Sequence, residues 1–203
     1  MEKGYVIIRK AFSTKFLDLF ARDFETVALQ CNSEDVFRTK NGDVKQIQNC
    51  QKWALFSELS HFIKDMGYDG EVLNMQYFIK HPDYKITAPH QDGAYFDNLD
   101  DDILTFWIPL HDVDASTSTM FYADWNGKRE IIKHEDCGSN LRTRTGKTGM
   151  SQYTSEIPMN VFTPVELKYG DCVVHNQFSV HYSNENSTTN PRIAITCIIK
   201  LNK

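Results

Sequence analysis

Four residues in this chain have the types and spacing of a metal site. His90 and Asp92 lie two positions apart in the stretch PHQDGAYF, so on an extended strand their side chains would project from the same face. A third ligand has to come from a distant strand, and the stretch GDCVVHNQFSVHY offers His175 and His181. Two imidazoles and one carboxylate leave three positions of an octahedron open, which suits Fe(II) that binds a co-substrate and dioxygen. The alternative is that each histidine packs in the core with its ring nitrogens satisfied.

The elements that would position these residues change character along the chain. Helical spacing of apolar residues predicts helices within 13–30 and 51–67, with Ser13 as an N-cap and Gly67 as a stop. After Gly70, short runs rich in branched and aromatic residues predict strands. These runs are 71–80, 102–110, 119–125, 161–168, 171–178 and 192–200. Helices followed by many short strands indicate an α+β chain, mainly β, built as a sandwich or barrel.

Composition limits the class of protein. A chain of 203 residues that is 41% hydrophobic fits one domain over 1–203, with a helical part at about 11–67 and a β core at about 71–203. The net charge of −5 argues against general nucleic-acid binding. The chain has no apolar run of about eighteen residues, so we expect no membrane-spanning helix. The N-terminus lacks the pattern of a secretory signal, so we expect a cytoplasmic protein.

Residues 125–160 form an exception, because they are rich in Gly, Ser, Thr and Arg and show little periodicity. A stretch of this kind inside a compact domain is typical of a lid or of disorder. Between positions 125 and 150, six basic residues stand against three acidic ones, which reverses the sign of the rest of the chain. We therefore predict a lid whose Arg142, Arg144 and Lys147 contact a carboxylate or phosphate on the substrate. The alternative is a solvated loop with incidental charge.

The ordered set of motifs resembles the phytanoyl-CoA dioxygenase family. The set comprises HxD at 90–92, a histidine about ninety residues later and an arginine eleven residues after that. The opening GYVIIRKAFS, the strand TFWIPLHDVD and the stretch from Gly170 to Arg192 belong to the same resemblance. Members of the family are Fe(II)- and 2-oxoglutarate-dependent oxygenases. The resemblance therefore implies a double-stranded β-helix, that is, a jelly-roll or cupin-like core, with the N-terminal helices packed outside.

The resemblance also implies a ligand set. Fe(II) would be held by His90, Asp92 and His181, because the family's last ligand lies in an HxS motif with an arginine downstream. His175 would then be neighbouring packing. Arg192 would form a bidentate pair with the distal carboxylate of 2-oxoglutarate, since a planar guanidinium matches a carboxylate best.

Further residues near the co-substrate follow from the same resemblance. Ser183 shares a face with the histidine at 181 and could reach the same carboxylate. Thr105 and Trp107 share a face of the central strand, and we expect them to line the 2-oxoglutarate pocket. Gln76, a polar residue on an otherwise apolar strand, is a further candidate, although it could equally face solvent.

The expected activity is that of a dioxygenase that uses 2-oxoglutarate and O2 to hydroxylate a C–H bond of a small metabolite, with release of succinate and CO2. Halogenating relatives have a small residue where this chain has Asp92, which favours hydroxylation over halogenation. Two alternatives are a non-catalytic cupin-like module that binds a metal or small acid, and a zinc-dependent hydrolase with the same ligands. Arg192 and Ser183 favour the oxygenase, because neither alternative needs a 2-oxoglutarate clamp. Substrate identity and oligomeric state do not follow from the sequence.

Overall fold

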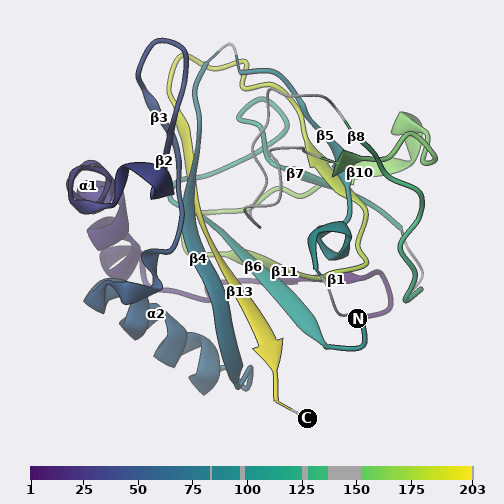
Figure 1. The fold of residues 1–203 in the computed structure, drawn as a ribbon, viewed down its shortest axis with the longest axis horizontal. Helices are drawn as coiled ribbons and strands as arrows, with labels where there is room; N and C mark the ends of the chain where they lie inside the picture. The colour runs from purple at the N-terminus through teal and green to yellow at the C-terminus, as the bar shows by residue number, and fades with distance from the viewer. Residues whose placement is uncertain (83, 97–98, 125–127, 137–151, 203) are drawn as a thin grey trace.

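The computed structural model describes residues 1–82, 84–96, 99–124, 128–136 and 152–202 (Figure 1). The longer helices are α1 (Thr14–Gln30) and α2 (Ala54–Asp65), and short 3-10 helices are η1 (Ser33–Asp35), η2 (Cys50–Lys52), η3 (Asp92–Tyr95) and η4 (Met159–Val161). The strands are β1 (Tyr5–Ile8), β2 (Val36–Arg38), β3 (Val44–Ile47), β4 (Gly70–Lys80), β5 (Thr87–His90), β6 (Ile103–Pro109), β7 (Met120–Ala123), β8 (Glu135–Asp136), β9 (Gln152–Tyr153), β10 (Phe162–Pro164), β11 (Cys172–Asn176), β12 (His181–Ser183) and β13 (Arg192–Leu201).

Two antiparallel sheets form the body of the molecule. The larger has the strand order β1-β11-β6-β13-β4-β3-β2, and the smaller has the order β10-β7-β12-β5. In Figure 1 the helices α1 and α2 lie together on one side of the large sheet, and β5, β7 and β10 lie on the other side. The mainly β jelly-roll with N-terminal helices packed outside is therefore confirmed.

Alternation along the central strand β6 explains the two faces of the large sheet. Phe106 and Ile108 pack in the cluster that includes the helices, whereas Trp107 packs in the cluster between the two sheets. Because successive side chains of a strand point to opposite faces, Thr105 shares the inner face with Trp107. The site residues of this strand thus face the small sheet, and its neighbouring residues hold the helices.

The helices cover the outer face through aromatic contacts. Ser13 caps α1 by accepting a hydrogen bond from the Phe16 N–H at 3.2 Å. Phe56 of α2 then packs edge-on between Phe20 of α1 and Tyr77 of β4, with ring centroids 5.1 and 5.4 Å away. The predicted cap is confirmed, and so is the stop at residue 67, a glycine with φ of 93°.

The predicted strand pattern differs from the structure in several places, and β8, β9 and β12 are among the strands that it lacked. The hairpin of β2 and β3 was missed, although Asn41-Gly42 marks its turn and Gly42 has φ of 93°. The predicted strand 161–168 forms only the three residues of β10 and an isolated bridge between Val113 and Leu167. Pro164 ends β10 because it has no N–H to donate to the ladder.

The predicted lid over 125–160 is described in two parts. Within them, β8 pairs antiparallel with β9 through Glu135 and Tyr153. Arg142, Arg144 and Lys147 lie outside the described residues, so their contact with a substrate stays a prediction.

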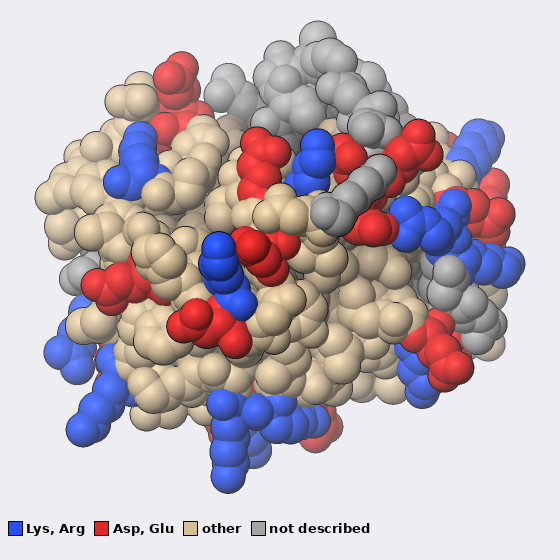
Figure 2. Space-filling view, turned by 90° about the horizontal axis from the view of Figure 1, so that it is seen from below, with Lys and Arg blue, Asp and Glu red and all other residues tan. Residues whose placement is uncertain are grey.

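The described helices include none that is both long and apolar enough to span a bilayer. Figure 2 shows one face of the molecule, on which basic and acidic side chains are interspersed. Interspersed charge of this kind gives that face no single-sign field of the sort that tracks a phosphate backbone.

Candidate metal centre and its cavity

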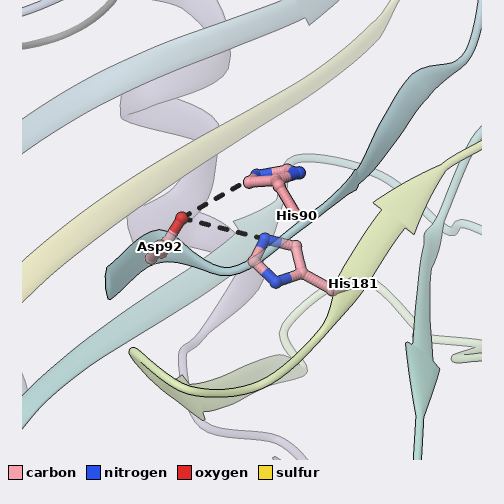
Figure 3. A group of neighbouring side chains, drawn as sticks. All are labelled: His90, Asp92 and His181. Carbon is pink, nitrogen blue, oxygen red and sulfur yellow. Dashed lines mark ion pairs between the residues drawn. The ribbon is translucent and has the colours of Figure 1, made fainter. Parts of the chain in front are cut away.

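Two histidines and one aspartate converge between the sheets, and we call His90, Asp92 and His181 the metal triad. The pairing of β12 with β5 sets His181 directly opposite His90, and their ring centroids are 4.3 Å apart. Asp92 Oδ1 lies 3.9 Å from His90 Nε2 and 3.8 Å from His181 Nε2, and the three side chains point toward one another (Figure 3). Metal–ligand bonds of about 2.0–2.2 Å let one ion bridge atoms this far apart. The metal triad is therefore able to hold a single metal ion.

The backbone between the first two ligands differs from the expected strand. His90 ends β5 and Asp92 begins η3, so the two do not lie on one continuous strand. Gln91 between them is extended, with φ of −116° and ψ of 133°. One extended residue is enough to project its two neighbours to the same side. The predicted convergence is therefore present even though the strand ends earlier than expected.

Backbone carbonyls set which nitrogen of each histidine faces the metal position. His90 Nδ1–H donates to the Ala88 carbonyl, and His181 Nδ1–H donates to the Ser179 carbonyl, both at 2.9 Å. Each Nε2 lone pair is then directed at the metal position. Burial, together with the His90 and His175 rings, lowers the pKa of His181 well below its ordinary value. The ring is thus neutral, as a metal ligand must be.

The second carboxylate oxygen of Asp92 is held by two donors. Thr105 Oγ1 donates to Asp92 Oδ2 at 2.7 Å, and His175 Nε2–H donates to the same oxygen at 3.2 Å. Tyr122 in turn donates its hydroxyl hydrogen to His175 Nδ1 at 2.8 Å. Burial and the nearby Asp92 raise the pKa of Tyr122 well above 10, so its hydroxyl keeps the proton. Oδ2 of Asp92 is thus engaged by these donors, and Oδ1 is the oxygen that faces His90 and His181.

These contacts add to the expected parts of two residues. His175, expected to be neighbouring packing, also donates a hydrogen bond to Asp92. Thr105 lines the cavity and donates its hydroxyl hydrogen to the same carboxylate, and its contact with 2-oxoglutarate stays a prediction. Tyr122 was not singled out, because nothing in the stretch TMFYADW marks one aromatic as the partner of a histidine fifty-three positions away.

A cavity of about 110 Å³ opens beside the metal triad. A single water molecule needs about 10–15 Å³ by the same measure, so the cavity has room for more than water alone. Four of the residues expected at the 2-oxoglutarate pocket line it, namely Arg192, Ser183, Thr105 and Trp107. The cavity thus joins the metal triad to a buried guanidinium.

Arg192 is 5% exposed and begins β13. Its guanidinium lies over the Trp107 ring at 5.3 Å, and Nη1 donates a long bond of 3.4 Å to the Phe78 carbonyl. Its Nε has no acceptor among the described residues, and burial lowers the pKa of Arg192 to about 10. A buried cation without an acidic partner is costly, so this side chain is arranged to meet an anion in the cavity.

Gln76 lies elsewhere. It is fully buried on β4 and is paired with Thr196, a cavity-lining residue of β13, but it is not part of the cavity wall itself. Its side-chain oxygen accepts a hydrogen bond from Gln46 Nε2 at 2.9 Å. The alternative that it faces solvent is wrong, and a contact with the co-substrate stays a prediction.

Gln91, the central residue of the HQD motif, is a structural hub that the sequence did not reveal. Its side-chain amide donates to the carbonyls of Glu130 and Phe178, and its Oε1 accepts from the Ile132 N–H. Its backbone N–H donates to His134 Nε2 at 3.0 Å. The residue between two metal ligands therefore fastens the chain at 130–134 beside them.

Comparisons with known proteins agree with this geometry. The chain has the fold of EvdO2 from Micromonospora carbonacea var. aurantiaca, at 18% identity and a TM-score of 0.74 over 98% of this chain and 87% of that one. It also has the fold of the epimerase SnoN, solved with Fe3+, alpha ketoglutarate and nogalamycin RO, at 18% identity and 0.72 over 98% and 79%. EctD from S. alaskensis with bound Fe matches at 12% identity and 0.70 over 100% and 76%. A search of curated protein sequences finds no match.

A family model described as phytanoyl-CoA dioxygenase (PhyH) matches residues 1–194. This match includes the metal triad and Arg192, ends within β13, and extends over most of the chain. The protein therefore belongs to the phytanoyl-CoA dioxygenase family of Fe(II)- and 2-oxoglutarate-dependent oxygenases.

Proposed function

We propose that this protein is an Fe(II)- and 2-oxoglutarate-dependent dioxygenase that hydroxylates a C–H bond of a small molecule. The observation that carries the proposal is the pairing of the metal triad with an unpaired buried arginine across one small cavity. A metal ion alone would need only the triad. The guanidinium at the other end calls for a ligand with a second negative group.

The donor set fits the metal. Two neutral imidazoles and a carboxylate that offers a single oxygen match the facial triad of non-haem Fe(II) oxygenases, which keeps positions open for a co-substrate and dioxygen. His90, Asp92 and His181 would hold Fe(II), and Arg192 with Ser183 would bind the distal carboxylate of 2-oxoglutarate. When bound, Fe(II) and 2-oxoglutarate supply the oxidising chemistry, with one oxygen atom of O2 going to the substrate and the other to succinate as CO2 leaves.

The protein's own residues supply orientation and exclusion of water. Thr105 and His175 keep Asp92 from binding through both oxygens, so they preserve the open positions. Apolar side chains, among them Phe78 and Met120, line the rest of the cavity and limit access of water to it. The presence of Asp92 supports hydroxylation over halogenation, since the carboxylate occupies the position that a halide would need.

The substrate is the least constrained part of the proposal. An anionic group on it was inferred from Arg142, Arg144 and Lys147, which lie outside the described residues. The neighbour SnoN was solved with nogalamycin RO, a small molecule. We propose a small-molecule substrate. The inference that this substrate carries a carboxylate or phosphate comes from the sequence alone.

Anaerobic titration tests the proposal. Fe(II) followed by 2-oxoglutarate should produce a visible metal-to-ligand charge-transfer band, and admission of O2 should release succinate. Replacing any member of the metal triad by Ala should abolish the band. His175→Ala is the matched control and should weaken metal binding without removing a ligand. A normal band in His181→Ala, with loss of the band in His175→Ala, would show that His175 and not His181 is the third ligand. The absence of a band in the wild type would contradict the proposed function.

A further inference from the structure

A second buried cation lies beside Arg192. Lys80 ends β4, is 4% exposed, and is the direct partner of Arg192 in the β13–β4 ladder. Within the described part of the chain, neither cation forms an ion pair with a carboxylate. When Lys80 is protonated, it and Arg192 are two adjacent positive charges that repel one another, and this end of the cavity then carries a strongly positive potential.

The Lys80 ammonium is fixed by oxygen atoms of the cavity wall. Its Nζ donates to Ser183 Oγ at 3.0 Å, to the Ser183 carbonyl at 3.1 Å and to the Asn184 carbonyl at 2.5 Å. Thr87 Oγ1 lies at the edge of hydrogen-bond range, 3.4 Å away. Ser183 and Thr87 line the cavity, so Lys80 lies directly behind that wall.

This arrangement decides how Ser183 can bond. When Lys80 is charged, its ammonium donates and cannot accept, so the Ser183 oxygen must then be the acceptor in its contact with Lys80. The hydroxyl hydrogen of Ser183 is then free to donate to another acceptor. A carboxylate held by Arg192 in the cavity is such an acceptor, and a hydrogen bond to an ionised group is stronger than one between neutral groups.

We propose that Lys80 is a positioning residue that directs the Ser183 hydroxyl at the distal carboxylate and, by its charge beside Arg192, makes the cavity select a dianionic 2-oxo acid over a monoanionic one. The inference rests on the proposed function, because it concerns the co-substrate of the same site. It goes beyond that function by assigning the choice between a 2-oxo dicarboxylate and a 2-oxo monocarboxylate to a residue that does not line the cavity.

The ionisation of Lys80 supports this assignment. Burial and the Arg192 guanidinium lower the pKa of Lys80 to about 7, while Glu185, exposed in the loop after β12, opposes them. The other groups that face the ammonium, from β5 and β12, are neutral oxygens. A carboxylate bound nearby favours the charged form and raises this pKa. At pH 8 the free protein therefore holds Lys80 mostly neutral, and binding of the dianion takes up a proton.

A purely structural part for Lys80 makes a different prediction. Its ammonium also donates to the carbonyls of Ser183 and Asn184, at 3.1 and 2.5 Å, which helps hold the turn between the last metal ligand and Arg192. Loss of a merely structural lysine would loosen this turn and weaken metal and co-substrate binding together. Loss of a positioning lysine weakens the co-substrate alone.

The experiment compares Lys80→Met with Lys85→Met, which removes an exposed lysine five residues further along the chain. Anaerobic calorimetry on the Fe(II)-loaded proteins measures the affinity for 2-oxoglutarate and for 2-oxobutyrate, and buffers of different ionisation enthalpy give proton uptake at pH 8. In Lys80→Met, 2-oxoglutarate should bind about tenfold to a hundredfold more weakly. The affinities for Fe(II) and for 2-oxobutyrate should change less than about threefold. The wild type should take up about one proton for each 2-oxoglutarate bound at pH 8, and this uptake should disappear in the variant. Lys85→Met should match the wild type.

Each other outcome overturns a stated part. Unchanged 2-oxoglutarate affinity in Lys80→Met would refute the positioning of Ser183, and equal loss of Fe(II) and 2-oxoglutarate would leave Lys80 a structural residue. Should Lys80→Met fail to fold, Lys80→Gln replaces it in the same measurements, because it keeps a hydrogen-bond donor without the charge. The charge argument can also be tested without any variant, since absence of proton uptake in the wild type refutes it. Failure of the wild type to bind 2-oxoglutarate at all would instead overturn the proposed function and this inference with it.

Discussion

Replacing Arg192 by Met should make the ligand-free protein more stable while it removes 2-oxoglutarate binding. The guanidinium is 5% exposed, its Nε has no acceptor among the described residues, and its one hydrogen bond to the backbone is 3.4 Å long. Methionine has a similar length, is apolar and adapts to irregular gaps. The substitution therefore removes a desolvation cost without opening a large void.

The magnitude follows from the ionisation of the side chain. Burial lowers the pKa of Arg192 to about 10, and this displacement from its ordinary value corresponds to roughly 3 kcal/mol. Loss of the stacking on Trp107 offsets about 1 kcal/mol, so the expected net gain is about 2 kcal/mol. Because the pKa is lower in the folded chain, this destabilisation is present in full below about pH 10. It fades only as the pH rises through about 10 toward the pKa of an arginine in the unfolded chain.

Urea unfolding at pH 7 measures the effect. A saturating ligand at a hundred times its Kd stabilises a protein by about 2.7 kcal/mol, so Fe(II) with 2-oxoglutarate should stabilise the wild type and leave Arg192→Met unchanged beyond the effect of Fe(II) alone. Arg9→Met is the matched control, since Arg9 is exposed and paired with Asp171 at 2.7 Å, and its loss should cost about 0–1 kcal/mol. Destabilisation of ligand-free Arg192→Met by more than about 1 kcal/mol would show that the protein itself compensates the guanidinium, and would refute the reasoning.

Three further substitutions test the network around Asp92. Thr105→Val removes a donor to Asp92 Oδ2, so a chelator competition should show Fe(II) binding about tenfold more weakly. An unchanged Fe(II) affinity would mean that the donor from His175 suffices. Tyr122→Phe leaves His175 Nδ1 buried without a donor, so urea unfolding should show a loss of about 1–3 kcal/mol, and a smaller loss would place water at that nitrogen. Gln91→Ala leaves three backbone groups without a partner and should accelerate limited proteolysis, and a wild-type rate would contradict its part as a hub.

Two members of the metal triad could be predicted because their signal is local. His90 and Asp92 are two residues apart, and a single extended residue between them projects both side chains to one side whatever follows. His181 was separated from His175 only by a family resemblance. Both histidines are buried beside Asp92, His181 facing its Oδ1 and His175 facing its Oδ2. Composition and spacing alone could not rank them.

The residues that hold the triad could not be predicted, because their contacts depend on strand register. Thr105 lies opposite His175 in the β11–β6 ladder, and this places both donors on one carboxylate. Lys80 meets Arg192 only because β13 pairs with β4 in one particular register. A shift by one residue would turn each of these side chains to the opposite face, and no sequence pattern specifies the register between strands this far apart.

The two ends of the cavity are joined by one short connection. His181 begins β12 and Arg192 begins β13, and Asn186 between them donates to the carbonyls of Lys80 and Asn190. Asn184 is fastened in the same connection, because its carbonyl accepts from Lys80 Nζ. A connection fixed at both Asn184 and Asn186 cannot vary its span freely. Because the connection is held at both points, the eleven-residue spacing fixes how the last metal ligand and the guanidinium lie at the two ends of one cavity, which supports the proposal that a single small dianion binds between them.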